Sequence, residues 1–206
     1  MLKIWGRTNS VNVKKVLWAA EELGLEYQRI DAGLQYGVNK TPEYLKMNPT
    51  GLVPTIDDDG FVLWESHAIV RYLAAKHGAG TLAPADPRAR ADADRWMDWA
   101  HGFAREFQRP LFWALVRNPP EKRDAKAIEA ATKKCGELLA VPNQYLANRP
   151  FFAGNSLTIG DIPLGCHVQL WMRLPIERPA LPNLQRWFDR LCTRPAYRKI
   201  VDIPLS

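Results

Sequence analysis

Residues 48–73, NPTGLVPTIDDDGFVLWESHAIVRYL, decide the fold because they combine two short apolar runs, an acidic turn and the start of a helix. The runs VPTI and FVLW flank a segment that ends in Gly60 and has the composition of a hairpin turn. Pro54 has no backbone N–H to donate, so we expect it at the first residue of a strand or at an edge. This arrangement leaves extended backbone beside a helix N-terminus, where a peptide can pair and a carboxylate can bind.

The residues before this stretch predict a strand, a helix and a second strand. Residues 2–5 are a short strand candidate, and apolar residues recur at helical spacing over residues 13–23. Gly24 is typical of the left-handed residue that ends a helix, and residues 27–30 alternate like a second strand. A short helix is expected to start at Thr41-Pro42. The first eighty residues therefore predict the order β-α-β-α-β-β-α, an α/β domain over residues 1–80.

The rest of the chain predicts an all-α domain. Residues 81–87 combine two prolines with a helix-capping aspartate and form the expected linker. Residues 88–206 show helical rhythm and lack strand signals. We expect helices over residues 87–117, 121–147, 158–171 and 183–193.

Three local signals refine these helices. Pro110 should kink the first one, and Pro142 is expected to break the second. Thr158 and Asp161 fit an acidic form of the capping box, so the third helix should start at Thr158.

Composition indicates a globular protein without a membrane span. The chain has 206 residues, of which 47% are hydrophobic and 24% charged. No apolar run reaches the roughly 18 residues of a spanning helix, and the first ten residues lack signal-peptide order, so a cytoplasmic protein is expected. The three cysteines are widely spaced, which argues against a disulfide framework, a zinc site or a dithiol centre.

The positive charge does not favour nucleic acid as a partner. The net charge is +6, and the excess lies entirely after residue 80. These basic residues are interleaved with acids or placed on helix-like segments, without the aromatic and basic clustering of a nucleic-acid platform.

The order of elements, together with three motifs, resembles the cytosolic glutathione transferases over nearly the whole chain, in particular bacterial members related to the serine-type theta, phi and delta classes. The motifs are Asn48-Pro49-x-Gly51-x-Val53-Pro54, Glu65-Ser66-x-Ala68-Ile69-x-x-Tyr72-Leu73 and Leu157-Thr158-Ile159-x-Asp161. The resemblance implies a thioredoxin-like N-terminal domain joined to an all-helical domain, and glutathione as the co-substrate.

The resemblance also implies how glutathione would be held. Pro54 would follow a cis peptide bond, and the Val53 backbone would pair with the cysteinyl part of the tripeptide. Glu65 and Ser66 would take the γ-glutamyl end. Lys40, beside Asn39, aligns with the position that relatives use for the glycyl carboxylate, although a solvated loop lysine is equally compatible with the sequence.

Thiol activation would fall to the polar turn ahead of the first long helix. Ser10 is the first candidate, because the run Ser10-x-x-x-Lys14-x-Val16 lines up with the serine-type classes and the turn contains no tyrosine. Asn12 competes with it, since some bacterial and fungal relatives use an asparagine there, and Thr8 and Asn9 follow. The alternative is that these polar side chains only cap the helix.

The electrophile pocket should lie between the two domains and accept a small, hydrophobic molecule. Its aromatic candidates are Trp99, Phe103, Phe107 and Trp113, of which at least two are expected to serve core or dimer packing instead. Lys14 and Lys15 are expected on a solvated helix face, with Lys14 close enough in sequence to add positive potential. The four histidines show no ligand spacing, so no metal site is expected.

Relatives of this kind form homodimers, so a homodimer is expected here, with no cofactor besides glutathione. The reaction would be attack of the glutathione thiolate on an electrophilic carbon to give a thioether. Two alternatives stay open: another glutathione-dependent reaction on the same fold, such as isomerisation, ether cleavage or peroxide reduction, and a non-catalytic binding module.

Overall fold

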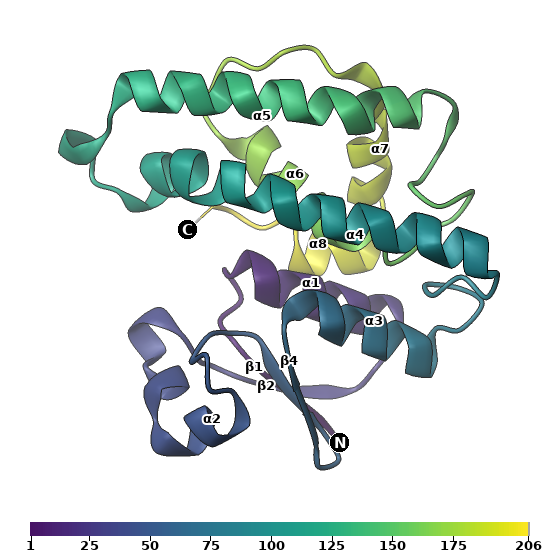
Figure 1. Cartoon of the computed structure of the whole chain (residues 1–206). Helices are drawn as coiled ribbons and strands as arrows, with labels where there is room; N and C mark the ends of the chain where they lie inside the picture. The colour runs from purple at the N-terminus through teal and green to yellow at the C-terminus, as the bar shows by residue number, and fades with distance from the viewer. Residues whose placement is uncertain (206) are drawn as a thin grey trace.

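The structure is a computed structural model that describes residues 1–205. Figure 1 shows two halves: a sheet with its helices below, and a bundle of helices above. The lower half has the predicted order β-α-β-α-β-β-α. Its elements are β1 (Leu2–Trp5), α1 (Val11–Glu22), β2 (Tyr27–Ile30), α2 (Pro42–Met47), β3 (Thr55–Asp58), β4 (Phe61–Trp64) and α3 (Ser66–His77), with the short helical turns η1 (Leu34–Tyr36) and η2 (Val38–Lys40) between β2 and α2.

The four strands form one mixed sheet in the order β2-β1-β3-β4. β1 runs parallel to β2 and antiparallel to β3, and Ile4 lies opposite Ile56 at the centre. Both isoleucines are fully buried, and α1 and α3 lie between the sheet and the helical half (Figure 1). β3 is an internal strand that begins one residue after Pro54, so the proline precedes the hydrogen-bonded ladder.

The segment before β3 is held by buried polar side chains. The Asn48 amide donates to the Leu52 carbonyl and to the Thr55 hydroxyl, both at 3.0 Å, and the Tyr44 hydroxyl donates to the same carbonyl at 2.6 Å. These bonds fix the path of the chain into Val53, and the Val53–Pro54 peptide bond is cis, as the resemblance implied. The spacing of the residues in this motif therefore has a local cause, because each polar residue holds one point of the turn.

The upper half is helical, as predicted. Its elements are α4 (Pro87–Phe107), η3 (Gln108–Arg117), η4 (Pro120–Lys122), α5 (Ala125–Tyr145), η5 (Leu146–Asn148), α6 (Asp161–Arg173), α7 (Pro182–Cys192) and α8 (Pro195–Ile200). Asp86 caps α4 by accepting a hydrogen bond from the Ala89 N–H at 2.8 Å, as its sequence indicated. No helix within residues 1–205 is long and apolar enough to cross a membrane.

Two prolines in this half behave differently. At Pro110 the regular helix has already ended, and residues 108–117 continue as a π-helical segment, because a proline removes one donor and crowds the preceding turn. Pro142 lies inside an unbroken α5, so the predicted break there is wrong. The Pro142 ring is buried against the bundle, and this packing tolerates the loss of one hydrogen bond.

α6 begins at Asp161, three residues after the predicted start at Thr158. The Asp161 carboxylate does reach back to the Thr158 N–H, at 3.0 Å, as the capping-box pattern required. It also accepts hydrogen bonds from the Phe152 N–H at 3.1 Å and the Trp187 indole at 2.9 Å. Complete burial raises the pKa of Asp161 to about 6 although these donors favour the ionised form. One carboxylate thus joins the loop before α6 to α7.

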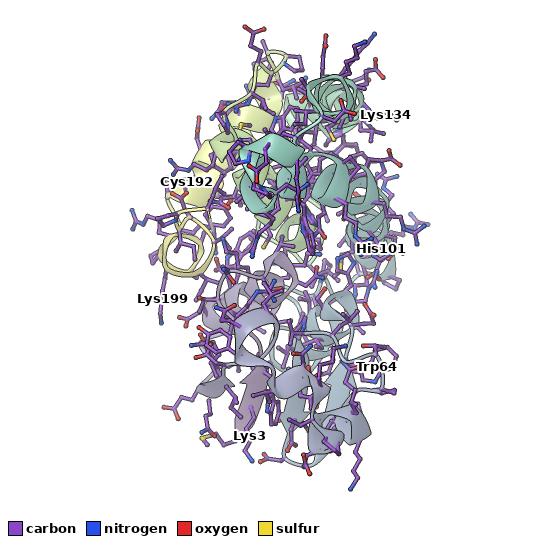
Figure 2. The ribbon with its side chains drawn as sticks, turned by 90° about the vertical axis from the view of Figure 1, so that its left-hand side faces the viewer. Lys3, Trp64, His101, Lys134, Cys192 and Lys199 are labelled. Atoms are coloured by element: carbon purple, nitrogen blue, oxygen red, sulfur yellow. The ribbon has the colours of Figure 1, made fainter. Side chains whose placement is uncertain are left out.

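The two halves meet along α1, which packs against α3 on one side and against α6 and α8 on the other. Trp18 is fully buried there, and its ring lies edge-on to Tyr197 with the centroids 4.8 Å apart. Glu22 accepts two hydrogen bonds from Arg194, at 2.7 and 2.6 Å. Figure 2 places Lys199 of α8 and His101 of α4 on opposite sides of the molecule, with this interface between them.

Candidate active site

Ser10 ends the turn between β1 and α1 and precedes the first residue of α1. Its side chain makes no capping hydrogen bond, and the residue is 7% exposed. Capping therefore does not occupy the Ser10 hydroxyl, which stays available to a bound molecule.

Ser10 lines a cavity of about 250 Å³ between the two halves of the molecule, which we call the Ser10 pocket. Val53, next to the cis proline, lines the same pocket, and Phe112 and Trp113 of η3 face it from the helical half. Asn12, the second residue of α1, also lines this pocket.

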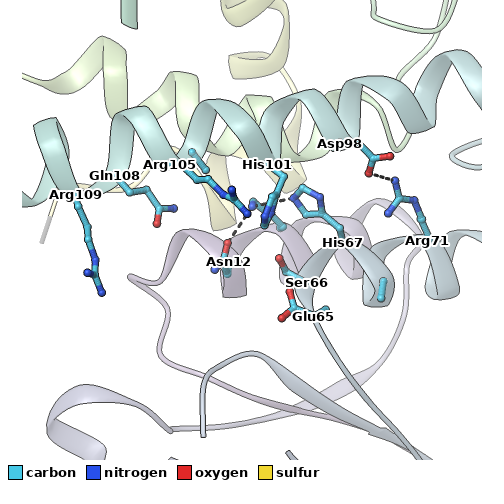
Figure 3. Close-up of a pocket in the computed structure, with 13 residues that line it drawn as sticks. Asn12, Glu65, Ser66, His67, Arg71, Asp98, His101, Arg105, Gln108 and Arg109 are labelled. Carbon is cyan, nitrogen blue, oxygen red and sulfur yellow. Dashed lines mark hydrogen bonds and ion pairs between the residues drawn. The ribbon is translucent and has the colours of Figure 1, made fainter. Parts of the chain in front are cut away.

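A second, larger cavity of about 690 Å³ lies between α3 and α4, and we call it the α3–α4 pocket. Figure 3 shows Glu65 and Ser66 together at the start of α3, at its lower rim. Neither side chain caps the helix, and Glu65 has a positive φ of 72°, a conformation that costs energy for a residue with a side chain. The first N–H groups of α3 are therefore unoccupied by a capping side chain, which suits them to an anion.

Asn12 lines both pockets and so stands at their junction. The Lys15 ammonium donates to Asn12 Oδ1 at 3.0 Å and lies 3.1 Å from His67 Nε2. Because an ammonium can only donate, both of these atoms must accept. The Asn12 amide nitrogen is then the part of that side chain left to donate to a ligand.

Comparisons with known proteins match both halves of the chain. The family model for the glutathione S-transferase N-terminal domain matches residues 1–75, and the model for the C-terminal domain matches residues 107–195. Glutathione S-transferase GstB of Escherichia coli strain K12 is 45% identical over 208 residues, with 100% of both chains covered. The chain belongs to the glutathione S-transferase family.

Further relatives agree with this assignment. Glutathione S-transferase 3 of Zea mays is 32% identical, with 99% of this chain and 95% of the relative covered. A solved structure of the theta class glutathione S-transferase from the citrus canker pathogen Xanthomonas axonopodis pv. citri, with glutathione bound, superposes with a TM-score of 0.95. It shares 50% sequence identity with this chain, and the match covers 100% of this chain and 99% of that one. The thioredoxin-like and helical halves are thus those of a glutathione S-transferase.

The family resemblance did not reveal the burial of two lysines in α1. Lys14 and Lys15 are 3% and 2% exposed, so their predicted place on a solvated face is wrong. Burial lowers the pKa of Lys15 from 10.5 to about 8 and also lowers the pKa of Lys14. Burial, assisted by the Lys15 charge, lowers the pKa of His67 to about 2, which keeps that ring neutral. α1 packs against α3 and also against α6 and α8. The spacing of apolar residues along α1 could not show that helices from the other half of the molecule cover its remaining face.

Of the two residues proposed for the glycyl end, Asn39 and Lys40, only Asn39 lines the Ser10 pocket. Asn39 lines it, and its amide donates to the Gly51 carbonyl at 2.6 Å, so it also fixes the loop before Val53. Lys40 is exposed, and its ammonium packs so close to Gly51 that a Cβ there would approach it to 2.8 Å. Lys40 does not line the Ser10 pocket or the α3–α4 pocket as the described residues form them.

Of the four aromatic candidates, only Trp113 lines the Ser10 pocket. Phe103 and Phe107 are 2% and 0% exposed and stack on each other with centroids 5.4 Å apart, so they are core residues. Trp99 borders a different groove, between α4 and α5. The apolar stripe of α4 faces the helical bundle. The aromatic residues that line the Ser10 pocket belong to η3, which begins at Gln108 after α4 has ended. Sequence reasoning missed Phe112 for this reason.

Within residues 1–205, no group of three or more histidine, cysteine, aspartate or glutamate side chains is placed to hold a metal ion. His67 and His101 nevertheless meet edge-to-face, with centroids 5.9 Å apart, above the α3–α4 pocket. This contact joins α3 to α4 beside the candidate site, a role that their spacing in the sequence did not indicate.

Proposed function

We propose that this protein is a glutathione transferase in which Ser10 and Asn12 stabilise the thiolate of bound glutathione for attack on a small electrophile. The observation that carries the proposal is the free Ser10 hydroxyl at the start of α1, facing a cavity that Val53 borders. The transferase with glutathione bound, which superposes over the whole chain, supports the same ligand here.

Glutathione would lie across the junction of the two pockets. Its cysteinyl backbone would pair with Val53, and its γ-glutamyl carboxylate would meet Ser66 and the start of α3. Glu65 would face the γ-glutamyl ammonium, and the glycyl carboxylate would point toward Asn39 and Lys40. An extended tripeptide spans roughly 10 Å, which suits two adjoining pockets better than either pocket alone.

Thiol activation needs a modest amount of energy. A free thiol of this kind has a pKa of about 8.5, so lowering it by about two units corresponds to roughly 2.7 kcal/mol. One hydrogen bond to a charged group contributes about 1.5–3 kcal/mol. The Ser10 hydroxyl, aided by the positive end of α1, can therefore supply most of the effect.

Asn12 would act as a second donor, positioned by Lys15. The ammonium holds Asn12 Oδ1 at 3.0 Å and leaves the amide N–H groups toward the cavity. Lys15 lines the α3–α4 pocket and not the Ser10 pocket, so it would act on the thiol through Asn12 and is a positioning residue for this step.

We also propose that the protein forms a homodimer, which the exposed apolar side chains support. Phe61 and Trp64 of β4 are 49% and 36% exposed, and Val141 beside the groove between α4 and α5 is 51% exposed. Figure 2 shows Trp64 and His101 on the same side of the molecule, so one partner could cover both halves. Light scattering should give about twice the monomer mass of 23.4 kDa, and Val141→Glu should shift it toward the monomer.

A cytoplasmic location is proposed from the thiols. Cys135, Cys166 and Cys192 are all free, which is the usual state in a reducing compartment.

The test of the proposed function is the pKa of the bound thiol. Ser10→Ala should raise it by about 1–2 units, seen as thiolate absorbance against pH, because one charge-assisted hydrogen bond is lost. An unchanged titration in Ser10→Ala, together with a raised pKa in Asn12→Ala, would transfer the main role to Asn12. Absence of glutathione binding to the wild-type protein at millimolar concentration, measured by calorimetry, would refute the proposal.

A further inference from the structure

His67 connects three helices beside the candidate site. It is the second residue of α3, directly after Ser66. Its Nε2 lies 3.1 Å from the Lys15 ammonium of α1. Its ring meets the ring of His101 of α4 edge-to-face, with the centroids 5.9 Å apart (Figure 3). The His67 side chain is therefore held from two sides, by α1 and by α4.

The Lys15 ammonium divides its donors between Asn12 and His67. It donates to Asn12 Oδ1 at 3.0 Å and to His67 Nε2 at 3.1 Å, and Lys15 is 2% exposed. Burial and the Lys15 charge hold the pKa of His67 at about 2, so the ring is neutral and Nε2 can accept. Because a lysine has a flexible stem and rotatable donors, a single acceptor fixes its ammonium poorly. His67 supplies the second acceptor that keeps the ammonium on Asn12.

The backbone of His67 belongs to the other end of the site. The first N–H that bonds within α3 is that of Ile69, which donates to the Glu65 carbonyl at 2.9 Å. The N–H groups of Ser66, His67 and Ala68 precede this bond, and no side chain caps the helix. All three residues line the α3–α4 pocket. A carboxylate bound there would contact the backbone of the residue whose ring accepts from Lys15.

We propose that His67 is a positioning residue that couples the γ-glutamyl end of glutathione to the activation of its thiol. The γ-glutamyl carboxylate fixes the first turn of α3, His67 in that turn holds the Lys15 ammonium, and Lys15 keeps the Asn12 amide turned to the thiol. This inference rests on the proposed function and adds a rule for the thiol substrate. A thiol peptide that lacks the γ-glutamyl carboxylate is activated less even when it is fully bound.

Two analogues of glutathione test this coupling in the wild-type protein. Glutaryl-Cys-Gly keeps the γ-glutamyl carboxylate and lacks the ammonium, whereas γ-aminobutyryl-Cys-Gly keeps the ammonium and lacks the carboxylate. The measured quantity is the pKa of the thiol at saturating protein, from thiolate absorbance, minus the pKa of the same ligand in solution. We expect this pKa to fall further with glutaryl-Cys-Gly, by about 1 unit, the effect of orienting one donor toward a charged group.

Direct electrostatics between ligand and thiol predicts the opposite order. A negative charge near the thiol disfavours the thiolate and a positive charge favours it, so without coupling γ-aminobutyryl-Cys-Gly would have the lower bound pKa. Equal shifts for the two analogues, or a larger fall with γ-aminobutyryl-Cys-Gly, would overturn the inference.

His67→Gln and His67→Met separate the acceptor from the volume of the ring. The glutamine carbonyl can still accept from the ammonium, whereas the methionine sulfur is only a weak acceptor. With glutathione bound, His67→Met should raise the pKa of the thiol by about 1 unit, and His67→Gln should stay within about 0.3 unit of wild type. His77→Met is the matched control, since His77 is the exposed last residue of the same helix.

Equal effects of His67→Met and His67→Gln on the bound thiol would show that the acceptor does not matter, and the inference fails. If Ser10→Ala raises the pKa of the bound thiol and His67→Met does not, the inference fails while the transferase function stands. If wild-type protein binds no glutathione in calorimetry, the proposed function itself fails. Should His67→Met not fold, the two analogues on the wild-type protein still decide.

Discussion

Replacing Lys15 by methionine should make the fold more stable and the enzyme less active. Methionine nearly preserves the volume of the lysine stem and removes a charge that is buried in α1. The same change removes the donor that holds Asn12 Oδ1 at 3.0 Å. The two effects have opposite signs because the charge is costly to bury but positions a residue of the site.

The magnitude follows from the pKa of Lys15, which is lowered from 10.5 to about 8. At pH 7 this corresponds to roughly 3 kcal/mol lost from the free energy of unfolding. The substitution also removes the hydrogen bonds that Lys15 makes to Asn12 and His67, and each loss lowers the free energy of unfolding by about 1 kcal/mol. The net gain should be about 1 kcal/mol, or roughly 2–4 °C in Tm, while kcat/KM for conjugation should fall about tenfold as Asn12 loses its fixed orientation.

The way in which the stability difference between Lys15→Met and wild type depends on pH tests whether the buried charge causes it. Below pH 8 Lys15 is protonated in the folded and the unfolded state, so the full cost is present. Between pH 8 and 10.5 the folded protein loses this proton first, and the cost declines as the pH rises. The stability difference between Lys15→Met and wild type should therefore shrink by about 2 kcal/mol between pH 7 and pH 10.

Urea unfolding at these two pH values is the assay, with Lys134→Met on the exposed face of α5 as the control (Figure 2). A Lys15→Met protein that is less stable than wild type at pH 7, or a difference that does not change with pH, would refute the reasoning. Unchanged kcat/KM would show that Lys15 does not position Asn12.

Two further predictions follow from side chains with defined partners. Asp161→Ala should lower the free energy of unfolding by about 3–5 kcal/mol in urea titrations, because it leaves the donors of Thr158, Phe152 and Trp187 unpaired in the core; a loss below about 1 kcal/mol would contradict a structural role. Glu65→Gln should weaken glutathione binding in calorimetry with little change in Tm, since the side chain is exposed and caps nothing, and a large fall in Tm would instead make Glu65 structural.

The N-terminal half could be predicted closely from the sequence because its signals are local. A glycine with φ of 64° at residue 24 ends α1, and the hairpin turn before Gly60 separates two four-residue strands. Asn48 and Tyr44 donate hydrogen bonds to the Leu52 carbonyl, which is four and eight residues away in the chain. Motifs of this kind depend on short-range geometry, which the order of residues specifies directly.

The helical half was predicted less well where packing overrides propensity. Pro142 does not break α5, because the surrounding bundle stabilises the helix through it. The aromatic residues of α4 could not be divided between core and pocket from their spacing alone. Phe103 and Phe107 share one stripe that packs on α6, and only the change to η3 turns Trp113 to the cavity.

The sequence by itself determined the family and the order of the elements, and it predicted the residues of a tripeptide site, since each is written in contiguous motifs. Only the tertiary structure decided the electrostatics of that site. Arg7 and Arg117 are 110 residues apart in the chain yet line one cavity. Lys15 is a buried charge that lies beside His67 of α3, on a helix against which α6 and α8 also pack. Burial and the approach of distant charges arise only when the two halves pack together.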